Sequence, residues 1–152
     1  MGTIRAVPMG HGLTLAEKLL HQALPNPPHM APDIFEESWE LGRLVIDPQF
    51  RGELEALKRC LFLALSFMDA NTSMANMHAT CTPVLGRLYR RFGFEVVARD
   101  VPLYGTAKTY TLIHGPSARV LEAVGGAQQP VNLPAMMGGR GHYSPRHQGA
   151  YA

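Results

Sequence analysis

The amino-acid sequence predicts one α/β domain with a mixed central sheet. Segments with the two-residue period of strands alternate with segments of helical period over residues 1–124. The last two strand-like segments follow each other directly, which predicts a hairpin and therefore antiparallel pairing in that part of the sheet. The chain has 152 residues, 46% hydrophobic and 17% charged, which suits one hydrophobic core and not a disordered polyelectrolyte. The formal net charge of +2 gives no support for a nucleic-acid partner.

The first half of the chain predicts a strand, a helix and a second strand. The first strand spans residues 3–7 and ends at a proline. Thr14 is the expected N-cap of the following helix, and Glu17, three residues later, completes a capping box. Residues 38–46 alternate as a strand does, and Gly42 within them is a candidate bulge or point of close approach.

Two further helices enclose a third strand. Residues 53–68 have helical period and are apolar on nearly every face in their second half, which predicts a buried helix. A short strand is expected over residues 77–81. The next helix has the clearest boundaries, because Thr82 suits the N-cap, Pro83 the first helical position and Gly93 the position after the C-terminus. Its apolar residues are expected to share one face toward the core: Val84, Leu85, Leu88, Tyr89 and Phe92.

The end of the chain separates the domain from a tail. Residues 94–102 and 109–113 predict the two hairpin strands, and residues 116–124 predict a short helix. Residues 125–152 contain six Gly and three Pro without any periodicity. This composition predicts a flexible tail outside the domain of residues 1–124.

Cysteine usage and targeting patterns predict a reduced, cytoplasmic protein without a metal site. Cys60 and Cys81 are too few for a disulfide framework and lack metal-ligand spacing, and His142 and His147 lack a third ligand. The N-terminus has no apolar segment typical of a signal peptide. The longest apolar run, residues 60–68, is far shorter than the roughly 20 residues that span a membrane, so no membrane span is expected.

Two segments resemble a known enzyme family. Residues 82–94, Thr-Pro-Val-Leu-Gly-Arg-Leu-Tyr-Arg-Arg-Phe-Gly-Phe, resemble the helix-to-strand motif of GNAT acyltransferases, which often ends in Leu-Tyr-x-x-x-Gly-Phe. Residues 39–44, Trp-Glu-Leu-Gly-Arg-Leu, follow residues 4–8, Ile-Arg-Ala-Val-Pro, in an order and spacing similar to one GNAT branch. That branch comprises the acyl-homoserine-lactone (autoinducer) synthases and the related long-chain N-acyl amino acid synthases. The resemblance covers about residues 2–124.

The resemblance implies a GNAT-like fold and an acyltransferase function. The expected sheet is mixed, mostly antiparallel and flanked by helices, with a V-shaped cleft between the strand of Glu40 and the strand at residues 77–81. The pantetheine arm of an acyl thioester would lie in this cleft. An acyl group would pass from acyl-carrier protein or acyl-CoA to a small amine, S-adenosylmethionine or an amino acid, to make a quorum-sensing signal without a permanently bound cofactor. Two alternatives stay open: an acyl-CoA-dependent N-acetyltransferase, and a catalytically inactive GNAT remnant that only binds.

Two departures from the family pattern modify these expectations. GNAT enzymes hold the diphosphate of CoA with backbone N–H groups of an Arg/Gln-x-x-Gly-x-Gly/Ala loop. Residues 51–56 read Arg-Gly-Glu-Leu-Glu-Ala, so Leu54 replaces a glycine and two carboxylates repel a diphosphate, which favours acyl-carrier protein as the donor. Autoinducer synthases also carry a strand-and-helix lobe before the segment that matches residues 4–8. Without that lobe the first strand would expose an edge, so we expect a homodimer or a poorly soluble chain.

Two side chains are candidates for proton transfer. Glu40 is the candidate base that accepts the proton of the attacking amine, and the alternative is an ion pair with Arg43 or Arg5. Tyr89 is the candidate acid that protonates the leaving thiolate, as the matching Tyr does in many acetyltransferases, and the alternative is a core position. A backbone N–H near Gly42 is expected to polarise the thioester carbonyl.

Other residues are candidates for binding. Substrate contacts are expected from the two matching strands: Arg5, Trp39, Arg43 and Leu44. Contacts to acyl-carrier protein or CoA are expected from one turn and one helix: Arg51, Gly52, Arg87, Arg90 and Arg91. Together with Lys58 and Arg59, the helix arginines form two basic clusters that would attract an acidic carrier protein, unless they are only solvated helix faces. His78 is expected to be a core histidine, and Cys81 has no histidine placed to activate it.

Overall fold

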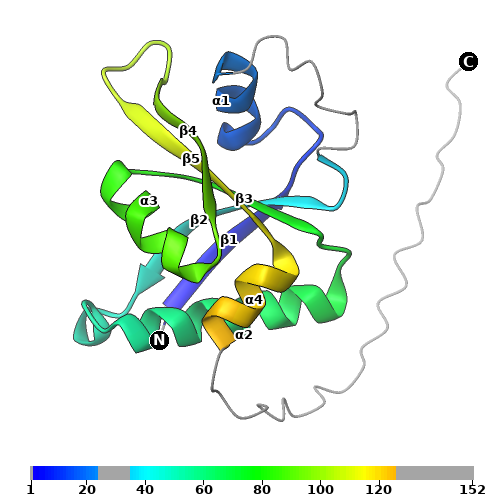
Figure 1. Ribbon diagram of the computed structural model, residues 1–152, viewed down its shortest axis with the longest axis vertical. Coiled ribbons are helices and arrows are strands. Elements are labelled where there is room, and N and C mark those ends of the chain that lie inside the picture. The colour runs from blue at the N-terminus through cyan, green and yellow to red at the C-terminus, as the bar shows by residue number, and fades with distance from the viewer. Residues whose placement is uncertain (1, 24–34, 126–152) are drawn as a thin grey trace, which may run out of the picture.

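The predicted alternation of strands and helices is present in the computed structural model, which describes residues 2–23 and 35–125. Over these residues the strands are β1 (Gly2–Pro8), β2 (Ser38–Ile46), β3 (Asn76–Cys81), β4 (Glu95–Pro102) and β5 (Thr109–Pro116). The helices are α1 (Leu15–Ala23), α2 (Leu54–Asn71), α3 (Pro83–Tyr89) and α4 (Ser117–Gly125), with short 3₁₀ turns η2 (Pro48–Phe50) and η3 (Arg90–Phe92) (Figure 1). The tail predicted for residues 125–152 lies outside the described residues except for its first residue.

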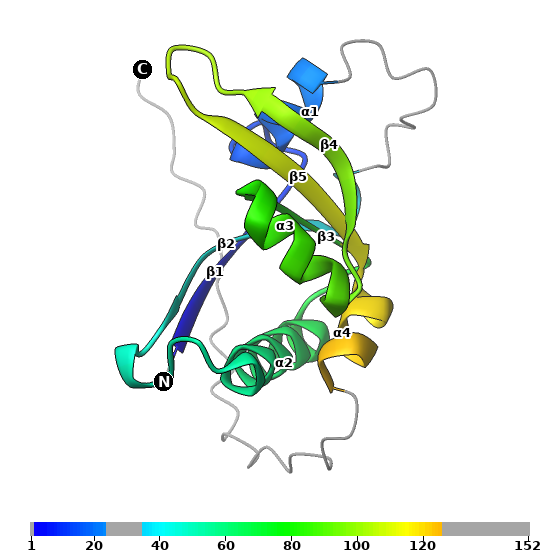
Figure 2. The same ribbon diagram turned by 60° about the vertical axis from the view of Figure 1, so that its left-hand side comes forward.

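The strands form one mixed sheet with the order β1-β2-β3-β5-β4. β2 and β3 are parallel, whereas the other neighbouring pairs are antiparallel. The prediction of a mixed, mostly antiparallel sheet is therefore confirmed. One face of the sheet carries α1, and the other carries α2, α3 and α4 (Figure 2).

Each face of the sheet has its own hydrophobic core. On the α1 face, Leu19 and Leu20 pack with Leu112 and Val101. The core on the other face is larger, because three helices supply it. Its buried members are Leu41, Leu61, Leu65, Met74, Met77, Cys81, Phe92, Phe94, Ile113, Val120 and Val124.

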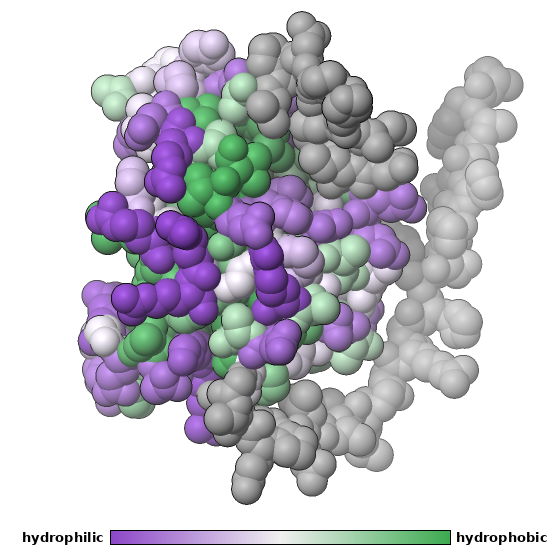
Figure 3. Space-filling view, in the orientation of Figure 1, coloured by the Kyte–Doolittle hydropathy of each residue, from purple (hydrophilic) through white to green (hydrophobic). Residues whose placement is uncertain are grey.

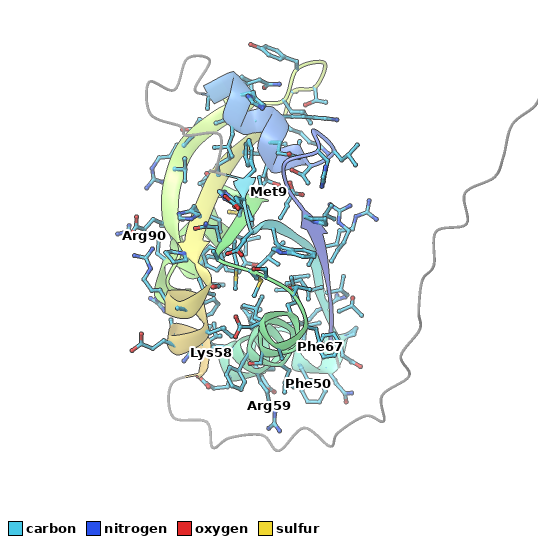
Figure 4. All side chains as sticks on the ribbon, turned by 90° about the vertical axis from the view of Figure 1, so that its right-hand side faces the viewer. Met9, Phe50, Lys58, Arg59, Phe67 and Arg90 are labelled. Carbon is cyan, nitrogen blue, oxygen red and sulfur yellow. The ribbon has the colours of Figure 1, made fainter. Side chains whose placement is uncertain are left out.

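α2 is not the buried helix that its composition predicts. Among its residues only Leu61 and Leu65 are buried, and Phe67 is 60% exposed. The apolar side chains that do not face the core line a groove of about 650 Å³ between α2 and β1, beside which Phe50 and Phe67 lie close together (Figure 4). The prediction was wrong because two separate apolar surfaces, a core and an open groove, produce the same all-round apolar pattern. Within residues 2–23 and 35–125, no helix is both long and apolar enough to cross a bilayer.

The capping box at the start of α1 is confirmed. Glu17 N donates to Thr14 Oγ1 (3.2 Å), and Glu17 Oε2 accepts from Thr14 N (2.9 Å) and from the Thr14 hydroxyl (2.8 Å). Glu17 Oε1 accepts from the backbone N–H groups of Gly10 (2.5 Å) and Gly12 (3.1 Å). Burial alone would raise the pKa of this carboxyl, but the hydrogen bonds from Thr14, Gly12 and Gly10 outweigh it and lower the pKa to about 2. One carboxylate therefore holds the connection from β1 to α1 in shape.

We expect Glu17 to make the fold sensitive to acid. Because its pKa is lower in the folded chain than in the unfolded chain, its contribution is complete above about pH 4.5 and is lost as the pH falls toward 2. Glu17→Gln should cost about 2–3 kcal/mol at pH 7 and flatten the stability profile between these pH values. Urea unfolding at pH 7, 4 and 2.5 measures both effects, with Glu122→Gln on the exposed side of α4 as the matched control. If the stability of Glu17→Gln depends on pH as that of the unsubstituted chain does, the role assigned to the Glu17 carboxylate is contradicted.

α3 and the 3₁₀ turn η3 that continues it together have the boundaries predicted for one helix, but the apolar face is not fully buried. Thr82 Oγ1 accepts from Leu85 N (3.4 Å), Pro83 is the first helical residue, and Gly93 has the left-handed φ of +85°. However, Val84 is 65% exposed and Leu85 is 41% exposed. Leu85 faces a cavity and not the core, because α3 lies over the place where β2 and β3 separate.

Candidate active site

The two central strands separate from each other partway along their length. β2 and β3 pair from Ser38 opposite Asn76 to Leu41 opposite Ala79, and pairing stops there although β2 continues to Ile46. Beyond this last pair the two strands diverge, as Figure 2 shows. The cleft expected between the strand of Glu40 and the strand at residues 77–81 is therefore present, and Leu41 and Ala79 mark its vertex.

β2 carries an irregularity directly after the vertex. Thr3 and Arg5 of β1 lie opposite Val45 and Gly42, so β2 has one residue more than β1 over this interval. Arg43 has a φ of +51°, which is the left-handed region that non-glycine residues rarely adopt. The two observations together define a β-bulge at Arg43. The sequence predicted an irregularity near Gly42, and the structure places it one residue later.

A cavity of about 250 Å³ occupies the cleft beside the bulge. Its walls are mostly apolar and come from both diverging strands, from α2 and α3, and from β1 and β5. The lining residues are Ile4, Leu41, Gly42, Arg43, Leu44, Leu61, Ala79, Thr80, Cys81, Leu85, Tyr89, Phe94 and Ile113. We call this the inner cavity. The sequence predicted Arg43, Leu44 and Tyr89 as site residues and a polarising backbone N–H near Gly42. It missed positions such as Ala79 and Phe94, which reach the cavity only because β2 diverges from β3.

A second cavity of about 600 Å³, which we call the outer cavity, continues from the inner cavity to the surface. Leu44, Leu85 and Tyr89 line both cavities. The outer cavity also reaches Arg51 and Gly52, the turn residues that the sequence assigned to the acyl donor. The two cavities together form a passage from the surface to the vertex.

Tyr89 lies where the inner and outer cavities meet. Its ring makes edge contacts with Phe92 and Phe94, with centroid distances of 6.1 and 5.9 Å. Burial and the neighbouring Cys81 raise the pKa of the Tyr89 phenol, so it stays protonated at neutral pH. The candidate acid predicted from the sequence is therefore in the cleft and in the protonation state that proton donation requires.

Cys81 is in the inner cavity but is a poor nucleophile. Burial raises the pKa of its thiol to about 11, and its Sγ donates to the backbone oxygen of Thr111 (3.7 Å). The thiolate is the reactive form of cysteine, and it is scarce at neutral pH here. Among the described residues, no three His, Cys, Asp or Glu side chains are grouped closely enough to hold a metal ion.

Glu40 lies on the α1 face of the sheet and is 3% exposed. One carboxylate oxygen accepts from Ala16 N in the first turn of α1 (2.5 Å), and the other accepts from Arg5 (3.4 Å). The ion pair that the sequence left open between two arginines is therefore made with Arg5, whereas Arg43 is exposed. Glu40 is next to the vertex in register, but it is not among the residues that line the inner cavity.

Of the predicted substrate-binding residues, two line the inner cavity and two lie outside it. Arg43 and Leu44 line the inner cavity. Trp39 lies outside it: its Nε1 donates to the backbone oxygen of Ser73 (3.0 Å), and its ring packs against the core. Arg5 is half-exposed and pairs with Glu40. The structure therefore groups Arg43 and Leu44 with Tyr89, and Arg5 with Glu40.

The predicted basic clusters lie on different elements, and all their members are exposed except Lys58, which is half-buried. Arg87, Arg90 and Arg91 are exposed on α3 and η3, and hydrophilic side chains gather over this part of the surface (Figure 3). Lys58 and Arg59 lie apart from Arg90, on α2 (Figure 4), and Lys58 pairs with Glu55 (3.1 Å). Both α2 and α3 line the passage. We call Arg87, Arg90 and Arg91, on α3 and η3, the α3 cluster.

Comparison with solved structures decides the fold. No protein-family model matches the chain, and no curated protein matches it. The chain is similar to MesI, a CoA-dependent acyl-homoserine lactone synthase (TM-score 0.56, 15% identity), and to the AHL synthase LasI (TM-score 0.53, 18% identity). It is also similar to BjaI, a CoA-dependent acyl-homoserine lactone synthase solved with SAM and isopentyl-CoA (TM-score 0.52, 14% identity).

The fold is GNAT-like. The three matches cover 82, 81 and 82% of this chain, and 60, 62 and 56% of MesI, LasI and BjaI respectively. The chain thus spans less than two thirds of the length of these GNAT-like structures. At 14 to 18% identity the likeness is one of fold, and it confirms the GNAT-like architecture that the motifs at residues 39–44 and 82–94 implied.

Proposed function

We propose that the protein is an N-acyltransferase that moves an acyl group from a pantetheine thioester to a small amine. The observation that carries the proposal is the passage that ends at the β2–β3 vertex beside the bulge at Arg43. The pantetheine arm occupies the outer cavity, and the acyl chain occupies the apolar inner cavity. At about 250 Å³, the inner cavity is smaller than the roughly 300–1,000 Å³ of typical ligand sites, which suits one acyl chain.

A backbone N–H at the bulge polarises the thioester carbonyl. The extra residue of a bulge does not join the regular ladder of backbone hydrogen bonds, so a backbone N–H there can point to a ligand. Such a donor stabilises the oxyanion that forms when the amine attacks the thioester carbonyl, an effect worth about 3–4 kcal/mol in other acyl-transfer enzymes. Gly42 and Arg43, both in the wall of the inner cavity, are the residues that present it.

In the proposed reaction Glu40 accepts one proton and Tyr89 donates another. The amine nitrogen bonds to the carbonyl carbon, the carbon–sulfur bond breaks, and the amine proton passes to the Glu40 carboxylate. Tyr89 gives its phenolic proton to the departing thiolate and regains one from solvent. One proton leaves the amine and one is taken by sulfur, so the overall reaction is proton-neutral.

The donor we propose is an acyl-carrier-protein thioester, and the product is an N-acyl amino acid or an acyl-homoserine lactone. For the lactone, the N-acylated S-adenosylmethionine closes its ring when its own carboxylate displaces the sulfonium group, which leaves as methylthioadenosine. Glu53 and Glu55 are exposed at the start of α2, and Arg51 donates to the backbone oxygen of Ile46 (3.3 Å). This arrangement offers little to the diphosphate of CoA. MesI and BjaI are nevertheless CoA-dependent synthases, so the test includes both donors.

A panel of thioesters and amines tests the function. The chain is incubated with acyl-carrier-protein and CoA thioesters of several chain lengths, with S-adenosylmethionine or amino acids as acceptors. Free-thiol release and the mass of the product are recorded. Thiol release that depends on the amine, together with an N-acylated product, supports transfer, and thiol release without that product contradicts it.

One observation favours a second candidate, a domain that binds acyl thioesters without transferring the acyl group. Both carboxylate oxygens of Glu40 accept hydrogen bonds within the fold, as a purely structural residue would. Saturable binding of a thioester in the same panel, without thiol release for any amine, would establish this second candidate.

The α3 cluster should affect the use of carrier protein and not of CoA. Reversing Arg87, Arg90 and Arg91 to Glu removes attraction to an acidic carrier protein, so we expect about tenfold weaker use of that donor and a flatter salt dependence. Use of a short acyl-CoA should change little. The control reverses three exposed cations elsewhere, Lys18, Arg99 and Lys108. Equal losses for both donors would rule out a docking role.

A further inference from the structure

Four titratable residues on neighbouring strands are successive partners in register across the α1 face of the sheet. In register, Glu40 of β2 lies opposite His78 of β3, His78 lies opposite His114 of β5, and His114 lies opposite Glu95 of β4. Residues opposite each other on neighbouring strands project to the same face. Since Glu40 bonds to Ala16 N of α1, this face is the α1 face. We call these four residues the transverse row.

The transverse row runs from the interior to solvent. Glu40 and His78 are each 3% exposed, His114 is half-buried, and Glu95 is exposed. At the outer end Glu95 pairs with Arg119 (2.6 Å). At the inner end Glu40 occupies the register position next to the last β2–β3 pair, so the row begins at the cleft vertex.

The two histidines are in contact, and one buried ring nitrogen has no hydrogen-bond partner among the described residues. The rings of His78 and His114 are tilted by 42° with centroids 4.9 Å apart. His114 Nε2 donates to Asn76 Oδ1 (2.9 Å), which orients that ring. His78 Nε2 is buried and makes no hydrogen bond to any residue in the ranges 2–23 and 35–125. Buried polar atoms are nearly always paired, because an unpaired one costs about 1–3 kcal/mol, so this nitrogen calls for a functional explanation.

Both imidazoles are in the neutral form near pH 7. Burial, reinforced by the neighbouring His114, lowers the pKa of His78 to about 4. Burial and the positive charge of Arg119 lower the pKa of His114, whereas the negative charge of Glu95 raises it. A neutral imidazole has one N–H donor and one nitrogen acceptor, so it can accept a proton on one side of the ring and release one on the other.

We propose that His78 and His114 carry the proton of the attacking amine from Glu40 at the vertex to solvent beside Glu95. This inference rests on the proposed acyl transfer. Glu40 receives the proton as the nitrogen–carbon bond forms and gives it to one ring nitrogen of His78. His78 releases the proton of its other nitrogen to Nδ1 of His114, because His114 Nε2 already carries the proton that bonds Asn76 Oδ1. The same Nδ1 then gives a proton to water at the exposed end. Each group ends with the number of protons with which it began, so Glu40 is again a carboxylate, and the His78 ring rotates to regain its first tautomer before the next cycle.

The exchange of the His78 ring proton with water tests this path without catalysis. In ¹⁵N-labelled protein, NMR measures that exchange in the unsubstituted chain and in His114→Phe. If the path exists, the exchange in His114→Phe should be slower by about tenfold or more, because His78 is buried and His114 is its route to solvent. His11→Phe, at an exposed histidine outside the row, should leave the exchange unchanged. An unchanged rate in natively folded His114→Phe, or in His114→Gln if the Phe variant does not fold, would overturn the proposal.

Turnover then connects the path to the reaction. With the donor and amine that the unsubstituted chain uses, His78→Gln and His114→Phe should each lower acyl transfer by about 10–10²-fold, whereas thioester binding stays unchanged. Full turnover in both variants would overturn the catalytic role. If the unsubstituted chain transfers no acyl group, the proposed function fails, and the exchange experiment still decides whether the proton path exists.

Discussion

Replacing Ala79 by phenylalanine is expected to abolish acyl transfer with little loss of stability. Ala79 lines the inner cavity and lies opposite Leu41 in the last β2–β3 pair, so a larger side chain there projects into the space assigned to the acyl chain. Since about 250 Å³ is open at this point, the cost of overpacking should be at the low end of the usual 1–3 kcal/mol. Transfer should fall by about 10²-fold or more, as positioned acyl transfer depends on the placement of the reacting atoms.

Free-thiol release and thermal unfolding measure the two parts of this expectation. Ala118→Phe, on the exposed surface of α4, is the matched control and should behave as the unsubstituted chain does. A shorter acyl chain should be affected less than a longer one. Native stability together with unchanged transfer for every chain length would show that the acyl group binds elsewhere.

Glu40→Gln is expected to lower amine acylation by about 10²-fold or more while the fold is kept. The substitution removes the base but leaves a side-chain oxygen that can still accept the hydrogen bond from Ala16 N. Loss of the contact with Arg5 should matter less for stability, because Arg5 is half-exposed and exposed ion pairs are worth about 0–1 kcal/mol.

Two readouts separate the roles of Glu40. Unchanged turnover at native thermal stability would remove it from the mechanism. A large fall in stability would instead assign Glu40 to holding α1 on the sheet. Glu122→Gln, at an exposed carboxylate on α4, is the control for the loss of one negative charge.

Local signals were sufficient to predict the elements of the fold. The strand over residues 38–46 and the cap residues Thr14, Thr82 and Gly93 are as predicted, because alternation and capping depend on neighbours a few residues apart. α2 is a helix as predicted, but its burial was predicted incorrectly, since its apolar outer surface faces an open groove that no local pattern reveals.

The site depends on contacts between distant segments, and these limit what the sequence can show. Tyr89 and Leu44 were found because they belong to motifs, whereas Ala79 and Phe94 line the cavity only because two strands diverge. The partners of Glu40 come from β1 and α1, and the neighbours of His78 come from β2 and β5. Nothing in the spacing of these residues along the chain indicates the register that places them together.

The short parallel pairing of β2 with β3 also makes the sheet mechanically uneven. Within the described sheet, β1 and β2 form one antiparallel ribbon, β3, β5 and β4 form another, and only the pairs from Ser38 opposite Asn76 to Leu41 opposite Ala79 join them. The two ribbons can pivot about this seam without breaking the hydrogen bonds inside either one. Trp39 bonded to Ser73 and Glu40 bonded to α1 limit the pivot from opposite faces of the sheet. The width of the cleft is therefore set by a hinge of a few residues, so amide protons along this seam should exchange with water sooner than those inside the ribbons.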